Sequence, residues 1–332
     1  MPENPEVVVI TGASAGAGRA AVRRFARDRA HIGLLARGTD GLEAARSEVE
    51  QQGGRAIAIP TDVADAAQVE AAAEQVERAF GPIDIWVNDA MVTVFAPFLE
   101  ITPEEYRRAT EVTYLGFVYG TMSALKRMVP RDRGTVVQVG SALAYRSIPL
   151  QAPYCGAKAA IRGFTDSIRT ELLHRKSNVH LTMVQMPALN TPQFDWCESK
   201  LPNHPQPVPP IFQPEVAAEA IFYAAHHRRR EIYVGGSTMA AILGTKVAPG
   251  LLDRYLGKTG YQAQQTDQPV SPSRPNNLFH PLPGDRGAHG MFDARASSHS
   301  TQLWADTHRG WLALAGIGIG AVAGLAIRTV RA

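Results

Sequence analysis

The chain has 332 residues, of which 45% are hydrophobic and 20% are charged, and its formal net charge is +3. This is the composition of a globular protein with enough apolar residues for one large core. The small basic excess comes without a basic stripe interleaved with aromatic residues, so the sequence predicts no nucleic-acid partner. Two cysteines, Cys155 and Cys197, give neither a disulfide framework nor a metal-ligand spacing, which indicates a reducing compartment and no metal site. The first residues lack a basic segment followed by an apolar one, so no signal peptide is expected.

Short apolar stretches alternate with helical patterns from residue 7 onward. The predicted strands are 7–10, 31–36, 55–60, 83–88, 135–140, 180–185 and 231–234. The predicted helices follow the first strand to residue 29 and then cover 39–52, 66–80, 104–127, 151–176 and 214–227. Regular β-α alternation predicts an α/β fold with a doubly wound parallel sheet of seven strands. Right-handed crossovers place the carboxyl ends of all strands on one rim, where ligands bind in such sheets.

A glycine-rich segment follows the first strand and opens the first helix. Gly12, Gly16 and Gly18 let the backbone turn tightly and bring it, with Ala17, close to a pyrophosphate at the positive helix end. The same segment also matches G-x-S-x-G, with Ser14 as the nucleophile of an α/β-hydrolase. We reject that interpretation because about ten residues precede the motif, too few for the strands and oxyanion loop of a hydrolase. A tight turn without a ligand is the remaining alternative.

The end of the second strand predicts the cofactor. A carboxylate there would bind a ribose 2′-hydroxyl, whereas Arg37 offers a guanidinium suited to a 2′-phosphate, and Ser14 adds a hydroxyl donor. We therefore expect NADP(H) rather than NAD(H); the alternative is that Arg37 is a surface charge. Asp62, after the third strand, is expected beside the adenine, or as the N-cap of the next helix, or both.

Tyr154 and Lys158 lie four residues apart in the predicted helix 151–176, so their side chains share one face. A free tyrosine titrates near pH ~10, and an adjacent ammonium lowers the pKa of the phenol. The hydroxyl of Ser141 is placed to hold a substrate oxygen beside it. The three residues together predict a general acid.

These features together resemble the classical short-chain dehydrogenase/reductase family over residues 6 to 257. The matching positions are Thr11-Gly12-x-x-x-Gly16-x-Gly18, Asp62-Val63, Asn88-x-Ala90, Ser141 and Tyr154-x-x-x-Lys158. The resemblance implies a Rossmann-like fold and NAD(P)-dependent redox chemistry on an alcohol or carbonyl carbon. It implies that Tyr154 transfers the proton, that Ser141 contacts the substrate oxygen, and that Lys158 lowers the pKa of Tyr154 and binds the nicotinamide ribose. It also implies a homo-oligomer formed through the helices 104–127 and 151–176.

Three positions depart from the family pattern. The family's Asn-Asn-Ala-Gly is Asn88-Asp89-Ala90-Met91, which places a large side chain where glycine lets the cofactor approach. The asparagine of the family's proton relay corresponds to Thr113, whose hydroxyl has a shorter reach. The family's Pro-Gly after the sixth strand is Pro187-Ala188, and Thr191 is the expected contact of the nicotinamide carboxamide.

Two later segments differ from the rest in composition. Residues 193–212 are rich in proline and match the family's substrate lid; Phe194, Trp196 and Leu201 indicate either a hydrophobic substrate or aromatic packing on the core. Residues 258–309 are predicted to be an irregular linker, with the catalytic domain ending at 257.

Residues 311–327 carry no charge and would span about 26 Å as a helix at roughly 1.5 Å per residue. Arg309 and Arg328 flank this stretch, and Gly316, Gly320 and Gly324 recur at four-residue spacing. We predict a transmembrane helix over 310–328 that anchors a cytoplasmic catalytic domain; the alternative is a buried hydrophobic helix.

The sequence thus predicts a membrane-anchored oxidoreductase that moves a hydride between NADP(H) and a carbonyl or secondary-alcohol carbon of a small, hydrophobic substrate. A second hypothesis, motivated by Met91 and Thr113, is a catalytically weak NADP(H)-binding sensor or membrane scaffold.

Overall fold

The computed structural model of the protein describes residues 5–271 and 273–309. Its centre is a parallel sheet of seven strands in the order β12-β7-β6-β4-β1-β2-β3. In chain order these strands are β1 (Val7–Thr11), β2 (His31–Ala36), β3 (Arg55–Pro60), β4 (Ile85–Asn88), β6 (Thr135–Ser141), β7 (His180–Met186) and β12 (Glu231–Tyr233). The predicted Rossmann-like sheet is confirmed, and the strand order reverses beside β1, where β2 pairs on one side and β4 on the other.

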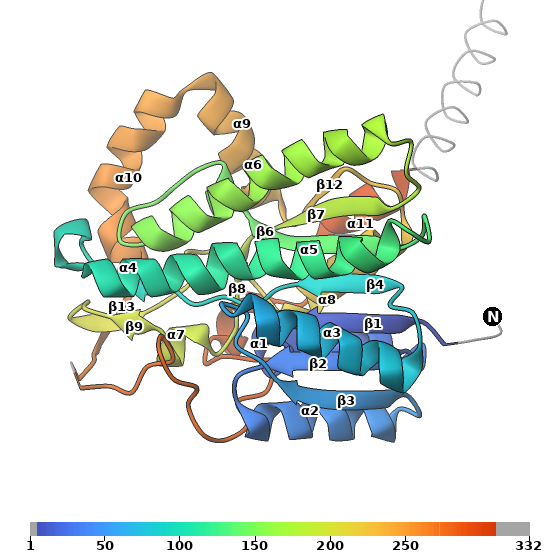
Figure 1. Ribbon diagram of the computed structural model, residues 1–332. Helices are drawn as coiled ribbons and strands as arrows, with labels where there is room; N and C mark the ends of the chain where they lie inside the picture. The colour runs from blue at the N-terminus through green and yellow to red at the C-terminus, as the bar shows by residue number, and fades with distance from the viewer. Residues whose placement is uncertain (1–4, 272, 310–332) are drawn as a thin grey trace, which may run out of the picture.

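Helices cover both faces of the sheet, so that three layers result (Figure 1). The helices that follow the strands are α1 (Gly16–Ala26), α2 (Thr39–Gln51), α3 (Ala66–Phe80), α4 (Pro103–Thr110), α5 (Gly116–Met128), α6 (Ala152–His174) and α8 (Pro214–His226). Apolar side chains of α1, α2 and α8 form one core with the sheet, and those of α3, α5 and the end of α6 form a second core on the opposite face. Strands β1 and β2 are buried on both faces, which explains their continuous apolar sequences.

The predicted helix 104–127 is divided by one turn of π-helix over Glu111–Leu115, between α4 and α5. Helix α4 begins with a capping box, in which Thr102 and Glu105 each accept a hydrogen bond from the other's backbone N–H, and with Pro103 at its first position. The hydrophobic periodicity continues through the π-turn, so the pattern alone predicts a single helix. Turns of this kind occur frequently at functional sites.

The chain beyond β12 is more ordered than the sequence indicates. Two further helices, α9 (Gly236–Val247) and α10 (Pro249–Ala263), form a hairpin, and the predicted boundary at residue 257 falls inside α10. The expected long loop 193–212 contains α7 (Gln193–Trp196), β9 (Glu198–Ser199), β10 (Asn203–Pro205) and β11 (Ile211–Phe212). The segment 258–309 contains β13 (Gln265–Pro269), β14 (Ala296–Ser297) and α11 (Thr301–Thr307).

Strand pairing joins this segment to the expected lid. Strand β13 pairs with β10 in antiparallel fashion, and β14 pairs with β11, which also pairs with β8 (Ala188–Leu189). The short strand β5 (Val94–Phe95) pairs with β9 of the lid. Short 3₁₀ turns occur at Phe98–Glu100, Ala142–Ala144 and Asp293–Arg295. Over residues 5–271 and 273–309, no helix is long and apolar enough to cross a membrane. The predicted transmembrane helix 310–328 lies outside the described residues.

A buried polar network joins β4 to α5, and these two elements pack closely at Gly120. The Asn88 amide donates to Gln138 at 2.9 Å and to Thr121 at 3.1 Å, and its oxygen accepts from the Trp86 indole at 2.8 Å. A methyl group at Gly120 would clash with that oxygen and lie 2.8 Å from the indole nitrogen.

We expect Gly120→Ala to lower the free energy of unfolding by about 1–3 kcal/mol, because overpacking also separates buried hydrogen-bond partners. Gly163→Ala is the matched control, since Gly163 also lies within a helix and an added methyl there meets nothing within 4 Å. It should be neutral or stabilise by up to ~1 kcal/mol. Urea denaturation of both variants measures the difference; equal stability would contradict the prediction.

Candidate active site

A cavity of about 480 Å³ opens at the carboxyl ends of the central strands. Its walls include the glycine loop after β1, the end of β2, the residues after β4, the end of β6, the start of α6 and the segment after β7. A cavity of this size lies within the range of roughly 300–1,000 Å³ that small-molecule sites occupy. The position agrees with the rim predicted from the topology.

The glycine loop forms one wall of this cavity. Gly12 and Gly16 have φ angles of +73° and +59°, a conformation that residues with side chains rarely adopt. A Cβ atom at Gly12 would also lie 3.0 Å from the backbone of Ala90. Ser14, Gly16 and Ala17 line the cavity beside Gly12, as predicted. Gly18 does not line it; a Cβ there would clash with the Gly12 carbonyl, so this glycine allows helix and strand to pack closely.

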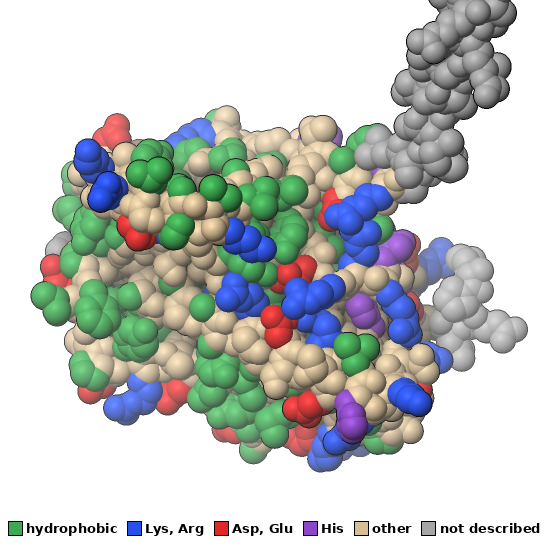
Figure 2. Space-filling model, turned by 90° about the horizontal axis from the view of Figure 1, so that it is seen from above, with side chains coloured by type: hydrophobic (Ala, Val, Ile, Leu, Met, Phe, Trp, Pro, Cys, Tyr) green, Lys and Arg blue, Asp and Glu red, His purple; other side chains and the backbone are tan. Residues whose placement is uncertain are grey.

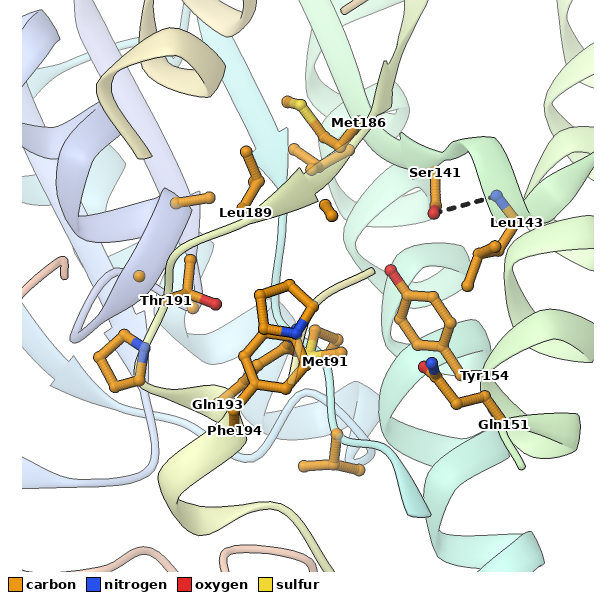
Figure 3. A pocket seen from close by; sticks show the side chains of 18 of the residues that line it. Met91, Ser141, Leu143, Gln151, Tyr154, Met186, Leu189, Thr191, Gln193 and Phe194 are labelled. Carbon is orange, nitrogen blue, oxygen red and sulfur yellow. Dashed lines mark hydrogen bonds between the residues drawn. The ribbon is translucent and has the colours of Figure 1, made fainter. Parts of the chain in front are cut away.

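Tyr154, Lys158 and Ser141 converge on the same cavity. The Lys158 ammonium is buried, donates to the Val139 carbonyl at 2.7 Å, and lies 5.5 Å from the centre of the Tyr154 ring. Ser141 is the last residue of β6, and its hydroxyl accepts from the Leu143 N–H at 3.1 Å. In Figure 3 the hydroxyl groups of Ser141 and Tyr154 point into the same space. The helix and the strand therefore bring together the three residues that the sequence singled out.

Burial is the largest influence on the pKa values of Tyr154 and Lys158. It raises the pKa of Tyr154, and the neighbouring Ser141 hydroxyl partly opposes that rise. The prediction that Lys158 lowers the pKa of Tyr154 therefore differs from the balance in the structure, where loss of solvent dominates. Burial also lowers the pKa of the Lys158 ammonium, while the negative charge of Asp89 raises it. Burial therefore favours the neutral phenol of Tyr154.

Asp89 is a site residue for which the sequence analysis predicted no role. Burial raises the pKa of its carboxyl group, and the charge of Lys158 opposes this. The carboxylate also accepts a hydrogen bond from the N–H of Gly18. The replacement of the second asparagine of the family motif by aspartate was visible in the sequence, but its proximity to Lys158 depends on the fold.

Two further predicted residues, besides Gly18, do not line the cavity. Thr113 sits in the π-turn, where its hydroxyl donates to the Val92 carbonyl at 2.7 Å and accepts from the Val92 N–H at 3.0 Å. This pair of bonds joins the π-turn to the segment after β4, and it uses the hydroxyl proton that a relay would need. Asn88 is buried in the network with Gln138 and Thr121 and faces α5.

Arg37, Asp62 and Val63, the residues expected near the adenosine of a cofactor, line one part of the cavity. Asp62 accepts from Arg108 at 2.6 Å, and the N-cap of α3 is Asp65 instead. The Arg37 guanidinium is not a free surface charge: it donates to backbone carbonyls of Asn277, Leu278 and Phe279 in the segment after β13. Burial lowers the pKa of this guanidinium, and the nearby Arg108 charge adds to the effect.

The opposite end of the cavity is apolar. Met91, Phe194 and Trp196 line the cavity together with Thr191 and Ala90. Phe194 also packs on Phe292, at a ring separation of 5.9 Å. Leu201 is buried in the same cluster without lining the cavity. Packing on the core is thus observed for Phe194 and Leu201, and the hydrophobic substrate remains a prediction.

Comparison with known proteins identifies the family. Residues 6–200 match the model of the short chain dehydrogenase family, so the chain belongs to that family. Uncharacterized oxidoreductase YxnA of Bacillus subtilis is 32% identical over 92% of this chain and 82% of its own length. Fatty acyl-CoA reductase of Acinetobacter baylyi is 28% identical over 71% of this chain and 78% of its own length.

Two solved structures share the fold. An alcohol dehydrogenase from the archaeon Thermococcus sibiricus, complexed with 5-hydroxy-NADP, is 27% identical and covers 70% of this chain and 96% of its own, with a TM-score of 0.60. A 3-ketoacyl-ACP reductase from Sinorhizobium meliloti is 25% identical and covers 71% of this chain and 99% of its own, with a TM-score of 0.61. The protein is an NAD(P)-dependent dehydrogenase or reductase.

The residues present suit such a cofactor. The glycines with positive φ leave room for a pyrophosphate at the start of α1, and the lining of the cavity also includes Arg37, Asp62, Tyr154 and Thr191. When bound, the nicotinamide supplies or accepts the hydride. Among the described residues, no group of three or more His, Cys, Asp or Glu side chains is placed to hold a metal ion.

We expect Asp89→Asn to shift the alkaline limb of the kcat/KM profile to lower pH. Removing the carboxylate removes the charge that favours the Lys158 ammonium, so Lys158 loses its proton at a lower pH. Asp65→Asn, at the N-cap of α3, is the control and should leave the limb in place. A limb that is unmoved or moves to higher pH in Asp89→Asn would show that this charge does not support the ammonium.

Proposed function

We propose that the protein reduces a carbonyl group on a hydrophobic substrate with NADPH, and that Tyr154 donates the proton. The main support is the convergence of the Tyr154 and Ser141 hydroxyls on one cavity, with the Lys158 ammonium 5.5 Å from the Tyr154 ring. In this proposal Ser141 holds the substrate oxygen and Tyr154 transfers its phenolic proton to that oxygen. Lys158 stabilises the phenolate that remains.

A neutral Tyr154 phenol suits the reductive direction that we propose. Burial raises the pKa of Tyr154, so this residue rests as a neutral phenol. A neutral phenol is ready to donate a proton, which is required when a carbonyl is reduced. The reverse reaction starts from the phenolate, whose formation in a buried site is supported by the charge of Lys158.

Two observations support NADP(H) as the cofactor. Strand β2 ends at Ala36 and is followed by Arg37, with no carboxylate at the position that binds a ribose 2′-hydroxyl. The related alcohol dehydrogenase from Thermococcus sibiricus was solved with 5-hydroxy-NADP.

The substrate end of the cavity supports a hydrophobic substrate. Met91, Leu143, Phe194 and Trp196 line it and offer no charge. The name of the relative from Acinetobacter baylyi, fatty acyl-CoA reductase, is consistent with this class of substrate. We therefore propose an acyl-type or similarly apolar carbonyl compound.

Replacing Tyr154 with phenylalanine should reduce turnover by about 10²- to 10⁴-fold, because the proton donor is lost while the ring remains. The dissociation constant of NADPH should change by less than about threefold, since the phenol proton is needed only for the chemical step. The assay follows NADPH oxidation with carbonyl compounds graded from small ketones to long-chain acyl substrates. Tyr119→Phe, the same change in α5, is the control.

Full turnover in Tyr154→Phe would refute the role of Tyr154. Saturable NADPH binding by the unaltered protein without turnover of any compound would favour the sensor or scaffold hypothesis.

We further propose that the protein associates with a membrane through residues 310–328 and that the catalytic domain faces the cytoplasm. The uncharged sequence of residues 311–327 supports this, and so do apolar side chains exposed on the α9–α10 hairpin. Those side chains are Met239, Leu243, Val247, Leu251 and Tyr255. Figure 2 shows groups of hydrophobic side chains beside Lys and Arg on the face seen from above.

Removal of residues 310–332 should release the protein from membranes in a fractionation without detergent. The cut preserves α11, whose Leu303 is buried and whose Asp306 pairs with Arg229 at 2.9 Å, so the truncated protein should keep its fold. Its unfolding temperature provides the check on folding. A full-length protein that already fractionates without membranes would contradict the anchor.

A further inference from the structure

The segment 273–293, here named the strap, crosses the rim of the sheet next to the cavity. It follows β13 and appears in dark orange below α7 in Figure 1. Five of its residues line the cavity: Asn277, Pro281, Leu282, Gly284 and Arg286. The catalytic roles proposed above do not use it.

The first half of the strap is held by two arginines. Arg37 Nη1 donates to the carbonyl oxygens of Phe279 at 3.0 Å and Leu278 at 3.2 Å, and its Nη2 donates to the carbonyl of Asn277. Arg108 Nε adds a bond of 3.2 Å to the Leu278 carbonyl, and the Leu278 side chain is fully buried. Three of the five N–H donors of Arg37 therefore bind the chain itself.

The second half of the strap lies on the glycine loop and on the start of α2. The N–H of Gly284 donates to Asp40 at 2.6 Å, and the carbonyl of Gly287 accepts from the Gly16 N–H at 3.0 Å. Between them, Asp285 accepts from the buried Arg19 at 3.3 Å. The same nitrogen of Arg19 donates to the carbonyls of Ser14 and Gly41, at 3.1 and 2.8 Å.

These bonds place Arg286 beside the glycine loop and the end of β2. It lines the cavity together with Ser14 and Gly38, and its side chain is exposed. Within the described part of the chain, the guanidinium has no hydrogen-bond or ion-pair partner. The adjacent Asp285 lies 3.3 Å from Arg19, which also pairs with Glu48 at 2.8 Å, so Asp285 is directed toward Arg19.

We propose that Arg286 binds the phosphate on the 2′-oxygen of the adenosine ribose in NADP(H), and that Arg37 is a positioning residue that holds the strap in place. The inference rests on the proposed NADP(H)-dependent function. In this fold the ribose 2′-oxygen binds near the end of β2, and Arg286, Ser14 and Gly38 line the cavity. A guanidinium without a protein partner matches a phosphate with two parallel hydrogen bonds, whereas Arg37 has already committed most of its donors.

The test compares the dissociation constants of NADP⁺ and NAD⁺ for the full-length protein by calorimetry. Arg286→Gln should weaken NADP⁺ by about 10- to 100-fold and NAD⁺ by less than about threefold, because a charge-assisted pair to the 2′-phosphate is lost. Arg78→Gln removes a comparable exposed arginine on α3 and should change neither constant. Equal losses for both cofactors would place Arg286 on the pyrophosphate and overturn the assignment to the 2′-phosphate.

The role of Arg37 is tested by a double-mutant cycle. If Arg37 acts through the strap, Arg37→Gln should weaken NADP⁺ in the unaltered chain but have much less effect on NADP⁺ in the Arg286→Gln chain. Trypsin should also cleave after Arg286 faster in Arg37→Gln, because the strap is released. Additive effects on NADP⁺, or an unchanged cofactor preference in Arg286→Gln, would overturn the inference.

Failure of the inference is distinguishable from failure of the proposed function. An unaltered protein that binds NAD⁺ as tightly as NADP⁺ would refute the NADP(H) preference itself. An unaltered protein that prefers NADP⁺, together with an Arg286→Gln variant that keeps this preference, would refute the role of Arg286 alone.

Discussion

The close approach of α1 to β1 at Gly18 is the contact on which the site depends. A Cβ atom at this position would clash with the Gly12 carbonyl and lie 2.8 Å from the Asp89 carboxylate. Because no side chain separates the helix from the strand, the positive end of α1 points directly at the cavity. The same contact lets the N–H of Gly18 donate to Asp89, which carries a negative charge toward Lys158. One missing methyl group thus positions both the cofactor loop and a charge in the catalytic group.

The buried charges explain how the site tolerates its departure from the family pattern. A lone buried ammonium loses its solvation, and this cost lowers the pKa of Lys158. The Val139 carbonyl and the Asp89 carboxylate compensate part of the loss, and the face of Phe117, 4.6 Å away, adds a favourable ring interaction. Aspartate in place of the family's second asparagine therefore supplies a charge rather than only a hydrogen bond. Thr113 does not take part in this compensation, because Val92 occupies its hydroxyl.

Elements with strong periodicity were predictable from the sequence. The predicted strands 31–36 and 55–60 and the predicted helix 66–80 agree residue for residue with β2, β3 and α3, because burial on fixed faces imposes the pattern of apolar residues. The convergence of Tyr154, Lys158 and Ser141 also followed from the order of elements. The π-turn did not, since one extra residue in a turn leaves the apolar pattern intact.

Long-range contacts of the backbone could not be predicted in the same way. The role of Arg37 depends on carbonyl groups some 240 positions later, and every residue has a carbonyl whatever its side chain. The strap is rich in Pro, Gly and Asn, a composition equally typical of a flexible linker. What distinguishes it is its partners: Arg37, Arg108 and Asp40 satisfy its main-chain groups where neighbouring strands would do so in a sheet.

The lid and the strap form one connected unit around the cavity. The N–H of Asn277 donates to the Trp196 carbonyl at 2.8 Å, and Arg274 binds the carbonyls of Phe194 and Cys197 at 2.9 and 2.6 Å. Strands β13 and β14, which flank the strap in the chain, pair with β10 and β11 of the lid and add backbone bonds beside these contacts. Direct hydrogen bonds thus join the lid to the strap within the later part of the chain, rather than through the sheet itself.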